Sequence, residues 1–407
     1  MRERLVIIGG GMAATRLVEE VIACAPHRFA ITVIGAEARL PYNRVLLSSL
    51  LAQDVSEADI DLKPAAWWRA QGVDLRFGAR VTGVDAQGSS VTLDDGSVLA
   101  WDKLVFATGS NAVRLPLPGA NLPGVLTFRD CADVEQMRAA IKPGARAAVI
   151  GGGLLGLEAA YGLAKAGVDV TVVHVMDRLM ERQLDATAAG LLKQDLERRR
   201  VHVMLDAKSA AILGDEKVEA LAFSDGQHIC VDMVVMAVGV APNIQLAAAA
   251  GLATKRGVLV DDAMRSSIEN IFALGECAEH RGLVYGLVQP AYEQARILAQ
   301  ALCDHDAAFE GAVTATNLKV SGIGVFSAGD YLGEGAQALV WRDHGLRRYR
   351  KLVLREGAQG TVLVGCVLYG ETSDGLWYLD LITSAQPIDH LRNDLIFGPA
   401  LCAREAA

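Results

Sequence analysis

The chain has 407 residues, enough for two or three domains that each bury a core of their own. It is 52% hydrophobic and 21% charged, which is typical of a globular α/β protein and excludes an intrinsically disordered one. The net charge of −9 argues against a nucleic-acid-binding protein, and no apolar run reaches the roughly 18–20 residues of a membrane span.

The first predicted element is a strand close to the N-terminus, at residues 5–8. It leaves no room for a signal peptide, so we expect a cytoplasmic protein. A glycine-rich turn, a helix and a second β-rich run at 30–34 follow it. The same order recurs after a strand at 147–150, with its second β-rich run at 168–173. Because this order is the βαβ unit of a parallel sheet, the sequence predicts an α/β fold with two Rossmann-type domains.

The segments between and after these repeats predict the domain boundaries. An antiparallel hairpin is expected between strands at 90–93 and 98–101, whose turn reads Asp-Asp-Gly. Proline-containing linkers at 115–119 and 241–243 mark crossings between domains. Strands and glycine turns after about residue 315 indicate a smaller C-terminal α+β domain. The predicted domains are 1–112 together with 245–314, then 113–244, and finally 315–407.

The two glycine turns carry the main functional signal. One G-x-G-x-x-G motif is weak evidence, but two copies that each follow a strand and precede a helix indicate two dinucleotide sites, the alternative being that one copy is only structural. The second glycine lets the backbone approach a pyrophosphate, and the helix N-terminus offers amide groups to the phosphates. The predicted binding residues are Gly9, Gly11, Met12, Ala13 and Ala14 in the first turn and Gly151, Gly153, Leu154, Leu155 and Gly156 in the second.

Two further strands end in motifs that resemble those of a known family. Residues 104–109 read Leu-Val-Phe-Ala-Thr-Gly, and residues 271–276 read Ile-Phe-Ala-Leu-Gly-Glu. With the first glycine turn they resemble the FAD fingerprints of two-dinucleotide-binding-domain flavoprotein reductases. The resemblance implies FAD on the domain of 1–112 and 245–314, and NADH or NADPH as co-substrate on 113–244. It assigns Val81, Ala107, Thr108, Gly109, Gly239, Gly275 and Glu276 to the cofactor sites, with Glu276 in place of the family's usual Asp.

Charged residues near the first site are further candidates. Glu37 follows the second strand and is expected at the adenosine ribose, the alternative being a solvated loop residue. The Pro-Tyr-Asn-Arg segment at 41–44 resembles ferredoxin- and rubredoxin-reductase-like flavoproteins, which implies that Arg44 contacts FAD. In those reductases a lysine pairs with the glutamate of the second glycine motif, but here Ser49 stands at the lysine position while Glu158 is present.

Glu158 is the one candidate catalytic residue. A buried carboxylate without its cation is expected to have a raised pKa. The alternative interpretation is that Glu158 only caps or lines its helix.

The strand at 170–173 ends without the acid that favours NADH. His174 takes that place, and Arg178 follows four residues later. Because an acid there would bind the ribose 2′-hydroxyl and repel a 2′-phosphate, its absence leaves NADH and NADPH both open. Only the family resemblance favours NADH.

Several segments narrow the resemblance further. Residues 32–47, 174–183, 275–288 and 318–329 look like the N-terminal FAD module of NAD(P)H-dependent assimilatory nitrite reductase, and the likeness runs from residue 5 to about 399. In that enzyme iron–sulfur and sirohaem domains follow, whereas Cys402 alone cannot hold a cluster. Residues 40–50 contain no cysteine for transfer from flavin to thiol.

The resemblance therefore implies an FAD-dependent NAD(P)H oxidoreductase. Hydride would pass from NAD(P)H to FAD, and electrons would leave to a separate acceptor. That acceptor would be an iron–sulfur protein such as ferredoxin or rubredoxin, or a nitrite or nitrate reductase component. The alternatives are an NAD(P)H oxidase that reduces O2 and a flavin redox sensor or scaffold. No metal site and no nucleic-acid or membrane partner is expected, and the chain is predicted to be a monomer or homodimer.

Two groups outside the motifs are also singled out. His280, Arg281 and Tyr285 are expected near the flavin edge without a catalytic role. A basic cluster in the C-terminal domain is interpreted either as a solvated hairpin face or as a docking site for an acidic partner. Its members are Arg342, Arg347, Arg348, Arg350 and Lys351.

Overall fold

The computed structural model describes residues 2–320 and 323–402, except for the side chains of residues 318–320. The chain forms two compact units, each built from segments that are far apart in the sequence. The first unit comprises Met1–Leu47, Val55–Asn111 and Val240–Ala312, and the second comprises Ser48–Asp54, Ala112–Gly239 and Val313–Ala407. Within the described ranges, no helix is both long enough and apolar enough to cross a bilayer.

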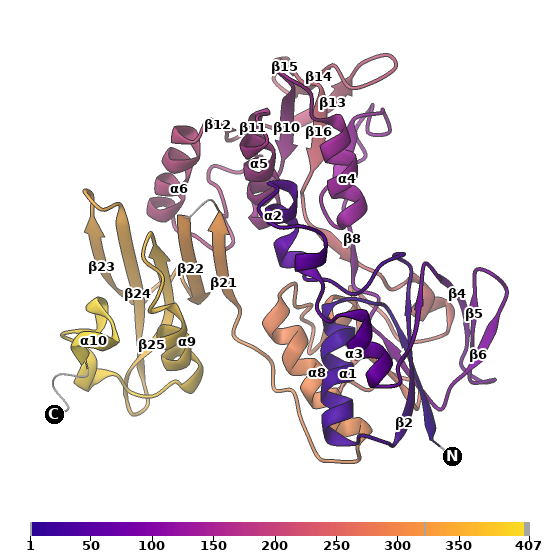
Figure 1. Cartoon of the computed structure of the whole chain (residues 1–407). Coiled ribbons are helices and arrows are strands. Elements are labelled where there is room, and N and C mark those ends of the chain that lie inside the picture. The colour runs from indigo at the N-terminus through magenta and orange to yellow at the C-terminus, as the bar shows by residue number, and fades with distance from the viewer. Residues whose placement is uncertain (1, 321–322, 403–407) are drawn as a thin grey trace. The chain divides into compact units, whose positions relative to one another are not determined.

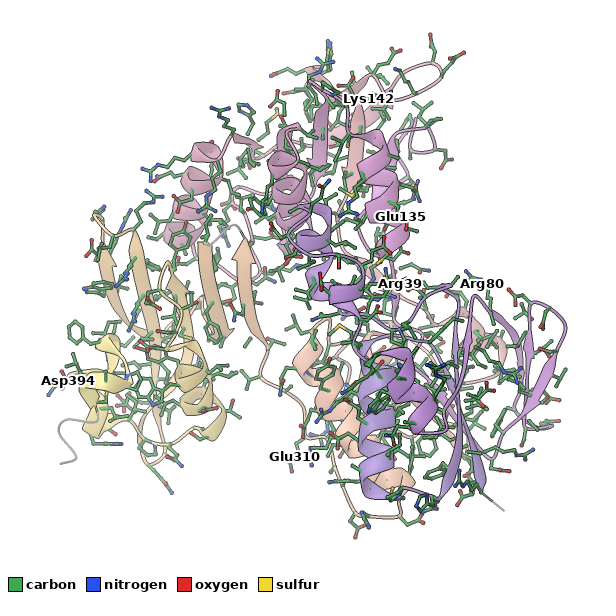
Figure 2. All side chains as sticks on the ribbon, in the orientation of Figure 1. Arg39, Arg80, Glu135, Lys142, Glu310 and Asp394 are labelled. Atoms are coloured by element: carbon green, nitrogen blue, oxygen red, sulfur yellow. The ribbon has the colours of Figure 1, made fainter. Side chains whose placement is uncertain are left out.

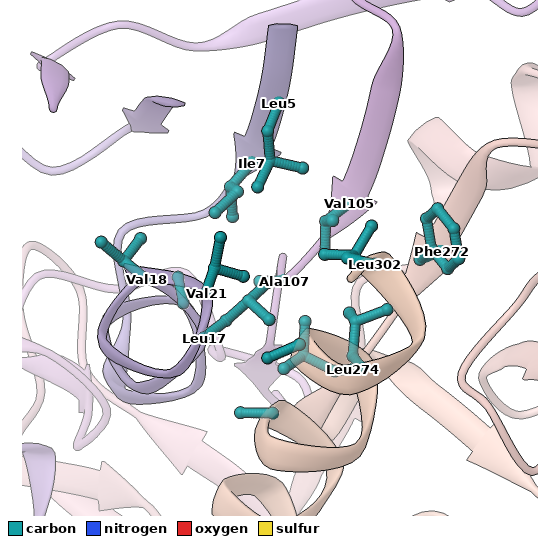
Figure 3. Close-up of a cluster of buried hydrophobic side chains, with 14 of the residues drawn as sticks. Leu5, Ile7, Leu17, Val18, Val21, Val105, Ala107, Phe272, Leu274 and Leu302 are labelled. Carbon is teal, nitrogen blue, oxygen red and sulfur yellow. The ribbon is translucent and has the colours of Figure 1, made fainter. Parts of the chain in front are cut away.

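The first unit is organised around a five-stranded parallel sheet with the order β19-β7-β1-β2-β3. Its strands are β1 (Glu3–Ile8), β2 (Phe29–Gly35), β3 (Asp74–Phe77), β7 (Lys103–Phe106) and β19 (Ile271–Ala273). Helices α1 (Met12–Cys24) and α8 (Val288–Leu302) lie side by side (Figure 1). Their apolar faces meet Leu5, Ile7 and Val105 of the sheet in a buried cluster (Figure 3). This packing holds the carboxyl ends of β1, β7 and β19 at one edge.

A three-stranded antiparallel sheet of β4 (Val81–Asp85), β5 (Ser90–Leu93) and β6 (Val98–Ala100) accompanies it and confirms the predicted hairpin. Gly96 adopts a φ of +82° in the turn between β5 and β6, which explains the glycine. The shorter elements of this unit are η1 (Arg44–Leu46), η2 (Ala58–Ile60), α3 (Ala65–Ala70), β17 (Val240–Pro242), α7 (Gln245–Ala249), β18 (Val258–Val260), η3 (Gly275–Cys277) and β20 (Ala278–His280). Strand β8 (Ser110–Ala112) pairs with β17 where the chain passes between the units.

The second unit contains another five-stranded parallel sheet, with the order β12-β11-β10-β16-β9. Its strands are β9 (Val125–Thr127), β10 (Arg146–Ile150), β11 (Asp169–Val173), β12 (Val201–Met204) and β16 (Met233–Met236). The helices of this part are α2 (Leu47–Leu51), α4 (Cys131–Ala140), α5 (Leu154–Lys165) and α6 (Ala186–Arg198). An antiparallel sheet of β13 (Ser209–Leu213), β14 (Ala220–Phe223) and β15 (His228–Cys230) completes it.

The C-terminal part of the second unit is a five-stranded antiparallel sheet with the order β21-β22-β25-β24-β23. Its strands are β21 (Ala315–Val320), β22 (Ile323–Gly329), β23 (Gln337–Asp343), β24 (Arg348–Gly357) and β25 (Gly360–Tyr369). They are followed by α9 (Gly375–Ser384), η4 (Asp389–Leu391), η5 (Leu395–Phe397) and α10 (Pro399–Cys402). The predicted fold class, two Rossmann-type sheets and a smaller C-terminal α+β domain, is confirmed.

Both interpretations of the basic cluster are wrong for three of its five members. The side chains of Arg347, Arg350 and Lys351 are only 22%, 11% and 13% exposed. Arg347 pairs with Asp195 of α6 at 2.9 Å, and Arg350 pairs with Asp374 at 2.7 Å. These cations therefore bind acids within the second unit, so they form neither a solvated face nor a surface for a partner.

Candidate functional site

The glycines of the two turns fall into two groups according to what surrounds them. A β-carbon on Gly9 would lie 2.1 Å from the carbonyl oxygen of Ala107, and one on Gly151 would lie 2.2 Å from that of Ala237. Both residues also have left-handed φ values, +119° and +126°. The sheet itself therefore requires glycine at the first position of each motif.

The second glycine of each motif has no such reason within the protein. Gly11 and Gly153 have φ values of −96° and −86°, which any residue adopts. A β-carbon on either would meet no described atom within 4 Å. Neither backbone strain nor packing requires glycine here; glycine is a favoured N-cap residue, and it also lets a ligand approach the backbone closely.

The helices that start at these glycines lack capping side chains. Gly11 and Gly153 are the N-caps of α1 and α5, and neither helix has an acidic residue in its first turn. In contrast, Asp130 caps α4 and Asp185 caps α6 through side-chain hydrogen bonds. Within the part of the chain that the structure describes, no side chain caps the first amides of α1 and α5, an arrangement that suits an anionic ligand such as a pyrophosphate.

The predicted FAD residues converge on the first turn. Ala107, Thr108 and Gly109 follow β7, and Gly275 follows β19, so both motifs lie at the sheet edge that carries the turn. A β-carbon on Gly275 would lie 3.1 Å from the β-carbon of Ala13, and Gly275 has a φ of +76°. These contacts bring the three fingerprints together around the N-terminus of α1.

Hydrogen bonds fix the two motifs in place. The hydroxyl of Thr108 donates to the carbonyl of Asn243 at 2.8 Å, and the Asn243 amide donates to the carbonyl of Thr108 at 2.9 Å. Glu276 accepts a hydrogen bond from the hydroxyl of Ser110 at 2.7 Å. The carboxylate of Glu276 is therefore held at the site.

Glu37, Tyr42 and Arg44 form one hydrogen-bonded group after β2. The Tyr42 hydroxyl donates to Glu37 at 2.7 Å, and the Arg44 guanidinium donates to Tyr42 at 3.0 Å and also to Glu37. The Arg44 guanidinium carbon lies 4.9 Å from the centre of the Tyr42 ring. Glu37 is thus an ordered acid and not a freely solvated loop residue.

The remaining predicted residues, Val81, Gly239 and Ser49, lie outside the two glycine turns. Val81 starts β4 and packs on the apolar cluster of the first unit. Gly239 has a φ of +120°, and its carbonyl accepts from the Val113 amide. Ser49 lies in α2, which packs on α5 because a β-carbon on Gly162 would lie 2.7 Å from Leu51.

Glu158 lies on α5, four residues after Leu154, and is partly buried. Among the described residues, none gives its carboxylate a hydrogen bond or an ion pair. Burial alone raises the pKa of Glu158 from 4.5 to about 7. The pKa of Glu158 is therefore raised, as expected for a glutamate without its lysine, and the carboxyl titrates near neutral pH.

His174 is buried, and both of its ring nitrogens have hydrogen-bond partners. Its ring accepts a hydrogen bond from the Gly152 amide at 3.1 Å, and its other nitrogen lies 3.0 Å from Glu181. Arg178 binds the adjacent Asp177 at 3.0 Å. Sequence reasoning missed Gly152 and Glu181. The run of three consecutive glycines, in which Gly152 is the middle one, was the only available signal for Gly152, and nothing in the sequence pattern pointed to Glu181.

His280, Arg281 and Tyr285, which were expected near the flavin edge, contact other residues of the first unit. His280 is fully buried and lies 2.8 Å from Asp262, which also binds Arg281 at 2.7 Å. These two partners lower the pKa of Asp262 to about 2, with Arg281 the larger cause. Tyr285 packs edge-on against Phe309. Their contacts are those of structural residues.

Comparison with known proteins adds a family to this geometry. The model of the pyridine nucleotide-disulphide oxidoreductases matches residues 3–295, and that of the rubredoxin NAD+ reductase C-terminal domain matches residues 315–386. Nitrite reductase (NAD(P)H) of Bacillus subtilis (strain 168) is 44% identical over 400 residues, which are 98% of this chain and 49% of that protein. The assimilatory nitrate reductase electron transfer subunit of the same organism is 39% identical over 397 residues, 97% of this chain and 51% of that protein.

The chain thus spans about half the length of these curated relatives. Among solved structures, the covalent putidaredoxin reductase–putidaredoxin complex matches with a TM-score of 0.85 and 26% sequence identity. The match covers 95% of this chain and 94% of the other.

Proposed function

Because the chain belongs to the pyridine nucleotide-disulphide oxidoreductase family, we propose that it is an FAD-dependent NAD(P)H oxidoreductase that delivers electrons to a separate acceptor protein. The observation that carries the proposal is the pair of N-cap glycines, Gly11 and Gly153, whose β-carbon positions are open among the described residues. Each begins a helix without a capping side chain at the carboxyl edge of a parallel sheet. Two such turns in one chain fit two dinucleotides.

We assign the first unit to FAD. Gly11 and the first amides of α1 bind the pyrophosphate, and Glu276, which Ser110 holds through a hydrogen bond, lies beside the ribityl–phosphate stretch. Glu37 faces the adenosine ribose, and Arg44, which is hydrogen-bonded to Tyr42, contacts phosphate or adenine. When bound, FAD supplies the redox chemistry, accepting hydride and releasing electrons singly or in pairs.

We assign Ala112–Gly239 to NAD(P)H and 315–407 to a third domain. Gly153, Leu154 and Leu155 bind the pyrophosphate of the nicotinamide dinucleotide. Glu158 follows on the same helix, and its carboxyl can hold or release a proton near pH 7. The missing acid at the end of β11 and the presence of Arg178 leave NADH and NADPH both admissible. We propose NADH as the preferred donor on family resemblance.

The acceptor is proposed to be an iron–sulfur protein or a nitrite or nitrate reductase component. The names of the relatives support this class, since one is an electron transfer subunit and one solved relative is bound to putidaredoxin. Every cysteine in the described ranges lacks a disulfide, which fits a cytoplasmic location.

The test is anaerobic titration of the purified yellow protein with NADH and with NADPH, followed by mixing with ferredoxin, rubredoxin and nitrite reductase components. Rapid reoxidation by one protein acceptor, at a rate that matches turnover, supports the proposal. Oxygen consumption at the turnover rate without any acceptor would show an oxidase instead. Slow reoxidation by all acceptors, with a change in molecular size on reduction, would show a redox sensor.

A further inference from the structure

The segment from His174 to Asp185, here called the clamp loop, binds both the N–H and the C=O of Gly152 in the second glycine turn. The Gly152 amide donates to Nδ1 of His174 at 3.1 Å, and the Gly152 carbonyl accepts from the Met180 amide at 3.0 Å. A β-carbon on Gly152 would lie 2.7 Å from the His174 ring. The loop is itself anchored, since Leu179, Met180 and Leu184 are fully buried. The position of the turn is thus set by this loop as well as by β10.

Glu181 fixes the ring that holds Gly152. Because Nδ1 of His174 accepts from an amide, it carries no proton, and Nε2 must carry the proton of the neutral ring. Nε2 lies 3.0 Å from the Glu181 carboxylate and donates to it. The Glu181 carboxylate therefore orients the ring and selects its tautomer.

The C-terminal sheet reaches this acid. Tyr331, two residues after the end of β22, donates its hydroxyl to the backbone carbonyl of Glu181 at 2.9 Å. The contacts from Tyr331 to Glu181, from Glu181 to His174 and from His174 to Gly152 form a continuous path inside the second unit. Gly153, the proposed pyrophosphate contact, is the next residue.

We propose that Glu181 and Tyr331 are positioning residues of the nicotinamide dinucleotide site, through which the C-terminal domain sets the second glycine turn. The inference rests on the proposed function of that turn. Hydrogen bonds from a helix N-terminus to phosphate depend on the direction of the amides, so a small displacement of Gly152 weakens them. The loss falls on binding of the diphosphate and much less on the hydride step, because the turn contacts the phosphates and not the nicotinamide ring.

The test uses the FAD-loaded protein and two readouts. Isothermal titration with ADP-ribose measures binding of the diphosphate without redox chemistry. Anaerobic stopped-flow reduction by NADH separates the apparent Kd from the limiting rate. We expect Glu181→Ala to raise both Kd values about tenfold and Tyr331→Phe about threefold, the range of one or two lost hydrogen bonds, with limiting rates within about twofold of wild type.

Two matched variants separate positioning from damage to the fold. Glu181→Gln keeps an oxygen that accepts from His174, and we expect it to restore binding to within about twofold of wild type. Tyr369→Phe removes a hydroxyl that binds Asp195 on α6, in the same domain contact but away from the clamp loop. It should leave both Kd values unchanged.

Unchanged ADP-ribose binding in Glu181→Ala would overturn the inference while leaving the proposed function intact. Equal losses in Tyr331→Phe and Tyr369→Phe would also overturn it, since they would show a general effect of domain docking. A wild-type protein that binds no ADP-ribose contradicts both the inference and the proposed function.

Discussion

Glu158 offers a prediction whose magnitude follows from the structure. Its carboxyl has a pKa of about 7 in the folded chain, raised by burial from 4.5. The unfolded chain releases this proton at lower pH than the folded chain does. The contribution of the neutral carboxyl to the free energy of unfolding is therefore fully present below pH 4.5 and is lost as the pH rises towards 7. The two pKa values correspond to a total loss of about 3 kcal/mol.

Glu158→Gln replaces the carboxyl by a neutral group of the same shape and removes this dependence. Between pH 5 and pH 8, the free energy of unfolding of the variant should therefore rise by about 2.5 kcal/mol relative to that of wild type. Urea unfolding followed by circular dichroism at both pH values measures it, and comparing differences cancels the titration of every other group.

The same substitution at Glu135, an exposed residue on α4, is the matched control for loss of one charge (Figure 2). If Glu158→Gln and wild type differ equally at pH 5 and pH 8, burial does not perturb this carboxyl. The Glu158 carboxyl would then not hold a proton near neutral pH.

Three further changes test other parts of the molecule. Gly11→Val should abolish FAD binding without unfolding the chain, because its side chain points where a pyrophosphate must lie; a yellow variant contradicts the site. Gly153→Val should keep FAD and its reduction by dithionite, but weaken reduction by NADH at least about 100-fold, which is about 3 kcal/mol of binding. Asp195→Ala should lower the free energy of unfolding by about 3 kcal/mol, since it leaves Arg347 and Tyr369 buried without their acid, and calorimetry measures this.

The local motifs were predictable because the residues that define each of them are only a few positions apart in the sequence. Strand, glycine turn and helix follow each other along the chain, so Gly11 and Gly153 were identifiable without coordinates. The pairing of Glu37 with Arg44 joins two residues that were singled out separately, seven positions apart. The division of glycines into those required by packing and those open to a ligand needed the structure, because Ala107 and Ala237 come from distant strands.

Interactions between distant segments could not be predicted from the sequence. The basic cluster predicted a surface, but Asp195, more than 150 residues earlier, makes part of it an internal contact. The segment Ser48–Asp54 belongs to the second unit, where Leu51 lies against Gly162, and no pattern in the sequence of either segment predicts that contact. A charge or a small side chain acquires its role from the partner that the fold supplies.

The third position of the two motifs shows how far the repeated units have diverged. A β-carbon on Gly156 would lie 2.0 Å from the Gly151 carbonyl oxygen, whereas the first turn carries Ala14 at the same position, 1% exposed. The first helix therefore accommodates a methyl group that the second cannot. Gly156→Ala should destabilise the second unit by about 2 kcal/mol despite the better helix propensity of alanine, and Ala14→Gly should cost only about 1 kcal/mol, the propensity difference. Equal stability of Gly156→Ala and wild type in urea unfolding would mean that α5 can move away from its turn, and that the close packing of helix and strand does not fix the amides that we assign to the dinucleotide.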